Sequence, residues 1–206
     1  EVDDIKVYNN PAIFDQYEPG SIFKALTMAA ALDQEKVTPS TTFNDTGEVK
    51  IANYTIKNSD NKAHGTVTMT DVLEQSLNTG AIFAMRQIGT DVFSEYVKNF
   101  GFGEKTGIEL DTEAVGDIKN LITEKKNKEL YAATASFGQG ISVTPLQMVA
   151  AFGAIANGGI LMKPYVVKEV AKVDGGKIAG QSKQIRRVIS ERAATLLGGM
   201  LVNVVE

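Results

Sequence analysis

A serine and a lysine stand three residues apart in "YEPGSIFKALTMAAALDQ" (17–34), where a polar loop turns into an apolar run. Serine is a weak nucleophile until a base takes its proton, and lysine acts as that base only when burial or a neighbouring cation lowers its pKa. Positions i and i+3 of a helix share a face, so Ser21 and Lys24 would project side by side. The apolar run would bury the stem of Lys24. The pattern predicts a nucleophile beside its own base.

The residues before the serine suit this chemistry. Pro19 stiffens the approach, and Gly20 permits a tight turn and the close approach of a substrate. The simpler alternative is that Ser21 only caps a helix that happens to contain a lysine. A second S-x-x-K, formed by Ser59 and Lys62, lies in a polar stretch with no apolar helix to bury its lysine. Context therefore favours the first pair.

A second polar pair follows in "EQSLNTGAIF" (74–83). Ser76 and Asn78 stand where one predicted helix ends and the next begins. A hydroxyl and a carboxamide there could pass a proton and orient a substrate amide. Both residues are also good helix caps, and that alternative stays open from this stretch alone.

The composition excludes several other kinds of site. The chain has no cysteine, and its one histidine, His64, lies in a polar stretch and is interpreted as a surface residue. We therefore expect no metal, no cofactor and no histidine base. A net charge of -4 with scattered lysines argues against nucleic-acid binding. No stretch approaches the ~20 apolar residues that a membrane span needs.

The remaining pattern predicts one helix-rich domain without repeats or long linkers. Expected helices cover 21–34, 68–77, "TGAIFAMRQIG", "TDVFSEYVKNFG", 144–159 and 190–205. Their predicted caps are Thr70 or Asp71, Thr144 before Pro145, and Ser190. Two minor hairpins are expected, one over 49–56 and one over 160–189 that turns at Gly175 and Gly176. No run is long enough for the central strand of a large sheet.

Taken together, the segments "YEPGSIFK", "SLNTGAIF", "GFGEKTGIEL" and "ASFGQGISVTPLQMVAAFGAIANGG" resemble the transpeptidase domain of penicillin-binding proteins. "YEPGS" and "FGQG" favour the monofunctional class B type. The resemblance implies an α+β, helix-rich fold like that of serine β-lactamases. Residues 1–206 would be a partial domain, a helical core with small β-hairpins and most of the central sheet missing.

The resemblance also implies roles. Ser21 would attack a D-Ala-D-Ala carbonyl or a β-lactam and form an acyl-enzyme, and its backbone N–H would be half of the oxyanion hole. Lys24 would accept its proton, and Ser76 would relay a proton to the leaving amine. Asn78 would hold Lys24 and the substrate amide, while Gly20 and Thr79 would contact substrate. Peptidoglycan stem peptides, β-lactams and cell-wall elongation or division proteins would be its partners, on the outer face of the bacterial cytoplasmic membrane.

One departure from the family pattern is large. The family's K-T-G lies on a strand beside the site, whereas the only match here, Lys105-Thr106-Gly107, lies in a glycine-rich loop and is interpreted as a decoy. The catalytic K-T-G would follow "MLVNVVE", where the chain stops. We therefore expect the 206-residue chain to react with penicillin slowly or not at all, with apolar helix faces left uncovered.

Two alternatives remain from the sequence. A β-lactam hydrolase or sensor of the same superfamily shares S-x-x-K and S-x-N, although "GFGEKTGIEL" and "FGQGISVTPLQ" speak against it. A catalytically silent scaffolding module would explain the absent K-T-G.

Overall fold

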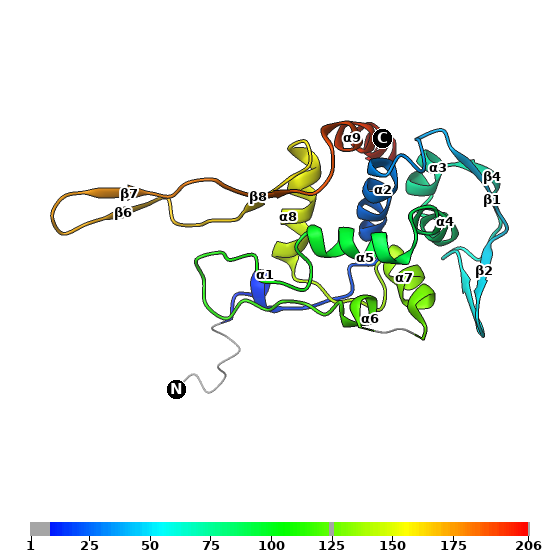
Figure 1. The fold of residues 1–206 in the computed structure, drawn as a ribbon, viewed down its shortest axis with the longest axis horizontal. Helices are drawn as coiled ribbons and strands as arrows, with labels where there is room; N and C mark the ends of the chain where they lie inside the picture. Colours follow the sequence, from blue (N-terminus) through cyan, green and yellow to red (C-terminus); the bar gives the residue numbers. More distant parts are fainter. Residues whose placement is uncertain (1–8, 124–125, 206) are drawn as a thin grey trace.

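A computed structural model describes residues 9–123 and 126–205. The described residues form a helical body from which one long β-hairpin projects (Figure 1). The helices are α1 (Pro11–Phe14), the 3₁₀ helix η2 (Gly20–Phe23), α2 (Lys24–Asp33), α3 (Met69–Glu74), α4 (Asn78–Ile88), α5 (Thr90–Asn99), α6 (Lys119–Ile122), α7 (Lys128–Ser136), α8 (Pro145–Ala156) and α9 (Glu191–Val205). None of the helices in these two ranges is long and apolar enough to cross a membrane.

Helix α2 runs through the centre of the body and is buried on all sides. Every residue from Lys24 to Leu32 is buried, and α4 and α9 pack against the helix. Its alanines allow this close packing because they present little side-chain volume to the neighbouring helices. The predicted apolar face is correct for Phe23 and Leu26, but Ile22 is 49% exposed. This residue belongs to the 3₁₀ turn, which directs its side chain outward.

Side-chain caps begin several helices, including α9, where the predicted cap Ser190 accepts a bond from the N–H of Ala193. Thr144 and Gln147 form a capping box at α8 with Pro145 in the first turn, as predicted. At α3 the cap is Thr68 rather than Thr70 or Asp71. Asp71 instead completes the capping box, and its side chain accepts a bond from the backbone N–H of Thr68.

The strands form small antiparallel pairs. They are β1 (Thr42–Asp45), β2 (Glu48–Ile51), β3 (Tyr54–Lys57), β4 (Gly65–Thr68), β5 (Ile160–Lys163), β6 (Glu169–Ala171), β7 (Lys177–Ala179) and β8 (Lys183–Arg187). The pairs β2–β3, β5–β8 and β6–β7 confirm the two predicted hairpins. The pair β1–β4 was not predicted, because its strands are separated by the whole of β2 and β3.

Two further features complete the body. Helix α7 was not predicted, since "KELYAATAS" has no side-chain cap at its start. Helices α8 and α9 leave apolar side chains on the surface, with Val149 67% and Val202 50% exposed. Uncovered apolar helix faces are therefore present, as expected from the sequence.

Candidate functional site

Ser21 lies in the 3₁₀ turn that leads into α2. Gly20 before it has a φ of 61°, which is in the region that glycine adopts most readily. The backbone N–H of Gly20 donates to the carbonyl of Gly138 at 2.9 Å, so the loop after α7 supports the turn. The Ser21 side chain is exposed, whereas Lys24, one turn later, is only 2% exposed.

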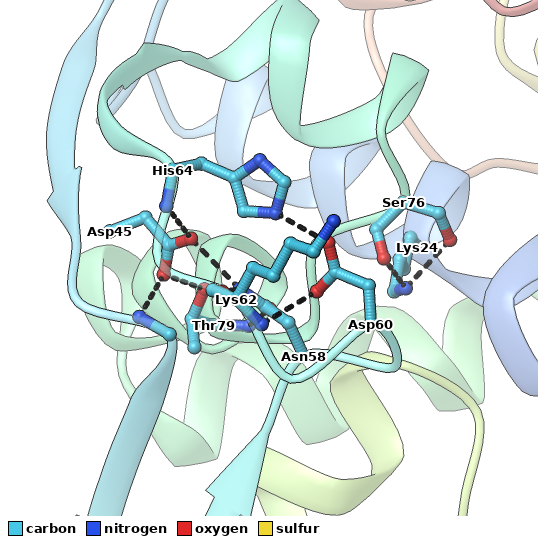
Figure 2. A network of polar contacts seen from close by, with 9 residues as sticks. Lys24, Asp45, Asn58, Asp60, Lys62, His64, Ser76 and Thr79 are labelled. Carbon is cyan, nitrogen blue, oxygen red and sulfur yellow. Dashed lines mark hydrogen bonds and ion pairs between the residues drawn. The ribbon is translucent and has the colours of Figure 1, made fainter.

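The Lys24 amine joins the two predicted polar pairs. Its Nζ lies 3.1 Å from Ser21 Oγ, 2.9 Å from Ser76 Oγ and 2.6 Å from the Ser76 carbonyl oxygen. Figure 2 shows the two contacts with Ser76. Once Lys24 loses a proton, its two remaining N–H groups can still donate to both Ser76 oxygens. Its lone pair is then free to accept the hydroxyl proton of Ser21.

Burial favours the neutral form of the Lys24 amine. It lowers the pKa of Lys24 from 10.5 to about 8, because the charged form loses solvation in the interior. At one pH unit below that pKa, roughly a tenth of the Lys24 side chains would be neutral. The arrangement can therefore activate a serine without histidine.

Ser76 reaches Lys24 through an unusual backbone. It has a φ of 55°, in the left-handed region. Its own N–H donates to the carbonyl of Leu73, and the next N–H, of Leu77, donates to the carbonyl of Val72. These two bonds form a Schellman motif that ends α3, and Ser76 occupies the position at which glycine is usual. The motif leaves the Ser76 carbonyl directed at Lys24.

The structure places the other predicted residues differently. The side-chain amide of Asn78 donates to the carbonyl of Lys57 at 2.8 Å, and within the described ranges no bond joins Asn78 to Lys24. The prediction that Asn78 holds Lys24 is therefore wrong. Thr79 is 2% exposed and its hydroxyl donates to Asp45 at 2.7 Å, so it lies inside the protein and not where substrate could touch it.

An open pocket of about 290 Å³ lies over Ser21. Its polar groups come from Ser21, Lys24, Glu74 and Ser76, and its apolar wall from Ile22, Ala25, Leu73, Phe152, Leu201 and Val204. A substrate here would meet the nucleophile at the edge of an apolar surface. Within the described residues, Lys24 is the one cationic side chain in this lining.

The lysine of the decoy K-T-G and the lysine of the second S-x-x-K both lie elsewhere. Lys105 lines a separate pocket with Gln147 and Leu161, and the neighbouring Thr106 is bonded to Glu113. It does not point into the Ser21 pocket, which confirms that expectation. Lys62 is exposed in the loop after β3. His64 is partly exposed at the surface, as predicted, and its ring lies 2.9 Å from Asp60 (Figure 2).

Residues 2–206 match the family model described as "Penicillin binding protein transpeptidase domain". The chain belongs to the penicillin-binding protein transpeptidase family. It is 37% identical over 206 residues to stage V sporulation protein D of Bacillus subtilis, covering 98% of this chain and 31% of that protein. Other relatives are homologues of the peptidoglycan D,D-transpeptidase FtsI. These relatives are class B penicillin-binding proteins, which confirms the predicted class.

Solved structures confirm the transpeptidase fold. Penicillin-binding protein 3 of Mycobacterium tuberculosis aligns with a TM-score of 0.88 and 28% identity, over 96% of this chain and 44% of that one. The same protein has been solved with ampicillin. The present chain spans about a third of the curated relatives it matches, such as 30% of a peptidoglycan D,D-transpeptidase homologue from Mesostigma viride. The predicted α+β class with small sheets is correct.

Sequence reasoning missed two supports of the site. One is the backbone contact between Gly20 and Gly138, although "FGQG" was singled out as a motif. The other is the pair of buried polar side chains Asp45 and Asn58, which both bond Thr79. "FNDTG" and "IKNSD" read as ordinary turn sequences, so no local signal distinguishes them.

Proposed function

We propose that this chain carries the acyl-transfer core of a peptidoglycan D,D-transpeptidase, as one part of a transpeptidase domain. The observation that carries the proposal is the buried Lys24 amine, 3.1 Å from Ser21 Oγ and 2.9 Å from Ser76 Oγ. Family membership supports it, and the complex of a relative with ampicillin supports β-lactams as ligands.

The proposed reaction begins with proton transfer from Ser21 Oγ to the neutral Lys24 amine. The oxygen attacks the carbonyl carbon of the D-Ala-D-Ala peptide bond, and the resulting oxyanion is stabilised by the N–H of Ser21 at the start of the helix. The carbon–nitrogen bond then breaks. The leaving D-Ala amine takes the proton from Lys24 through the hydroxyl of Ser76.

The second half reverses these transfers. An amine of another stem peptide attacks the Ser21 ester and forms the cross-link, while Ser21 recovers its proton. In a β-lactam the broken amide stays tethered to the acyl group, so the leaving nitrogen remains in the site. Asn78 and the backbone at Gly20 would orient the substrate amide. Cell-wall elongation or division proteins would be partners, at the outer face of the cytoplasmic membrane.

The test is labelling by a fluorescent penicillin, applied to the natural full-length polypeptide that contains this chain. We expect a stable covalent adduct on Ser21, identified by peptide mass, and no adduct in Ser21→Ala. Ser59→Ala is the matched control, because Ser59 belongs to the second S-x-x-K. Rapid loss of the adduct would favour a β-lactam hydrolase. No adduct on the folded full-length protein would favour a scaffolding module.

A further inference from the structure

Asp45 is a buried carboxylate that lies outside the proposed chemistry. It is 2% exposed, yet its hydrogen-bond partners among the described residues are all uncharged. Oδ1 accepts bonds from Gly47 N–H at 2.9 Å and Thr79 Oγ1 at 2.7 Å. Oδ2 accepts bonds from Asn58 Nδ2 at 2.8 Å and His64 N–H at 3.0 Å (Figure 2). Burying a carboxylate costs several kcal/mol unless such bonds compensate it.

Asn58 links Asp45 to the start of α4. It is 3% exposed, and its Oδ1 accepts the backbone N–H of Thr79 at 3.2 Å. That N–H is one of the first in α4, which has no partner within the helix. The N-cap residue of α4 is Leu77, which makes no side-chain cap bond. Asn58 therefore caps the helix from a different segment.

Lys57, the residue before Asn58, contacts the predicted site residue Asn78. The Lys57 carbonyl accepts the side-chain amide of Asn78 at 2.8 Å. Segment 57–58 thus contacts both Asn78 and Thr79, while Asp45 fixes Asn58 and the Thr79 hydroxyl. The loop packs closely at this point, because a Cβ on Gly47 would lie 2.9 Å from the backbone of Lys62 and Ala63.

We infer that Asp45, Asn58 and Thr79 are positioning residues for the Ser76–Asn78 segment of the acyl-transfer site. This inference rests on the proposed function. Within the described residues, no hydrogen bond joins these three side chains to Ser21 or Lys24. They set where α4 starts, and hence where the Ser76 carbonyl and hydroxyl stand relative to the Lys24 amine. Without them the segment would keep its helix but lose a defined register at its first turn.

The test measures acylation of the natural full-length polypeptide by a fluorescent penicillin, in Thr79→Val and Asn58→Ala. Thr79→Val keeps the shape and removes the hydroxyl, and Thr79→Ser restores it. We expect the acylation rate constant to fall at least tenfold in Thr79→Val and Asn58→Ala, while the concentration for half-saturation changes less. Thr79→Ser should recover most of the rate. In addition, the pKa in the pH–rate profile should move, since Lys24 has lost fixed partners.

A matched control separates positioning from stability. Glu113 is also a buried carboxylate, 7% exposed, bonded to Thr106 and Gly107 in a loop away from the Ser21 pocket. Glu113→Gln should lower thermal stability without changing the acylation rate of folded protein. Equal rates in Thr79→Val and wild type would overturn the inference. If the wild type itself gave no Ser21 adduct, the proposed function would fail, and the Lys24 pKa followed by side-chain NMR would still test the positioning.

Discussion

The carbonyl oxygen of Ser76 lies 2.6 Å from the Lys24 amine because Ser76 holds a left-handed backbone conformation, with a φ of 55°. Glycine would adopt this backbone more easily, but it has no hydroxyl to offer Lys24. The residue thus combines a backbone role that favours glycine with a side-chain contact that requires serine. Substitutions at this position can separate the two.

We predict that Ser76→Gly is more stable than Ser76→Ala by about 1 kcal/mol, because only alanine retains the cost of the left-handed conformation. Both variants lack the hydroxyl and should acylate at least tenfold more slowly than wild type. Urea unfolding and penicillin labelling measure the two effects. Equal stability of the two variants would disprove the backbone argument, and wild-type acylation in Ser76→Gly would disprove the proton relay.

The acylation rate should depend on pH through Lys24. Only the neutral amine accepts the Ser21 proton, and burial lowers the pKa of Lys24 to about 8. Below that pH the rate should rise roughly tenfold per pH unit, and above it the rate should level off. Stopped-flow labelling between pH 6 and 9.5 measures the profile. A rate that stays constant from pH 6 to 8 would contradict Lys24 as the base.

The same pKa shift should appear in stability. Lys24 in the unfolded chain keeps a pKa of 10.5 and so binds more protons than the folded chain between about pH 8 and 10.5. The free energy of unfolding should therefore gain about 3 kcal/mol from this residue over that interval, at 1.36 kcal/mol per pKa unit. Lys24→Met should lack this gain, which the difference between the two urea-unfolding series would reveal. Parallel series would contradict the lowered pKa.

Gly138→Ala should displace the nucleophile. A Cβ at Gly138 would lie 2.1 Å from the carbonyl oxygen of Gly20, and the φ of 80° there adds strain. We expect a loss of ~1–3 kcal/mol in stability and at least a tenfold lower acylation rate, since small misplacements of a reacting group cost up to ~100-fold.

Gly159→Ala is the matched control for this prediction. Its Cβ would lie 2.0 Å from the carbonyl oxygen of Ile189 at a φ of 93°, outside the Ser21 pocket. It should lose similar stability yet acylate at the wild-type rate when folded. Equal rates in the two variants would show that Gly138 does not support the nucleophile.

Lys105→Ala should leave acylation within about twofold of wild type and stability within about 0.5 kcal/mol, because Lys105 is exposed and lines a different pocket. Penicillin labelling and thermal melting measure these effects. A tenfold loss of rate would mean that Lys105-Thr106-Gly107 serves the Ser21 site after all.

The sequence by itself determined the features whose causes are local. Periodicity, Thr144, Pro145 and glycine stops place the long helices, and i to i+3 spacing places Ser21 beside Lys24. The tertiary structure decided what depends on long-range contacts. Burial of α2 on all sides lowers the pKa of Lys24, and packing brings Ser76 to it from 52 residues away. Asn78 bonds Lys57, and Thr79 bonds Asn58 and Asp45, because unpaired N–H groups and a buried carboxylate need partners. No local pattern shows which distant segment supplies those partners.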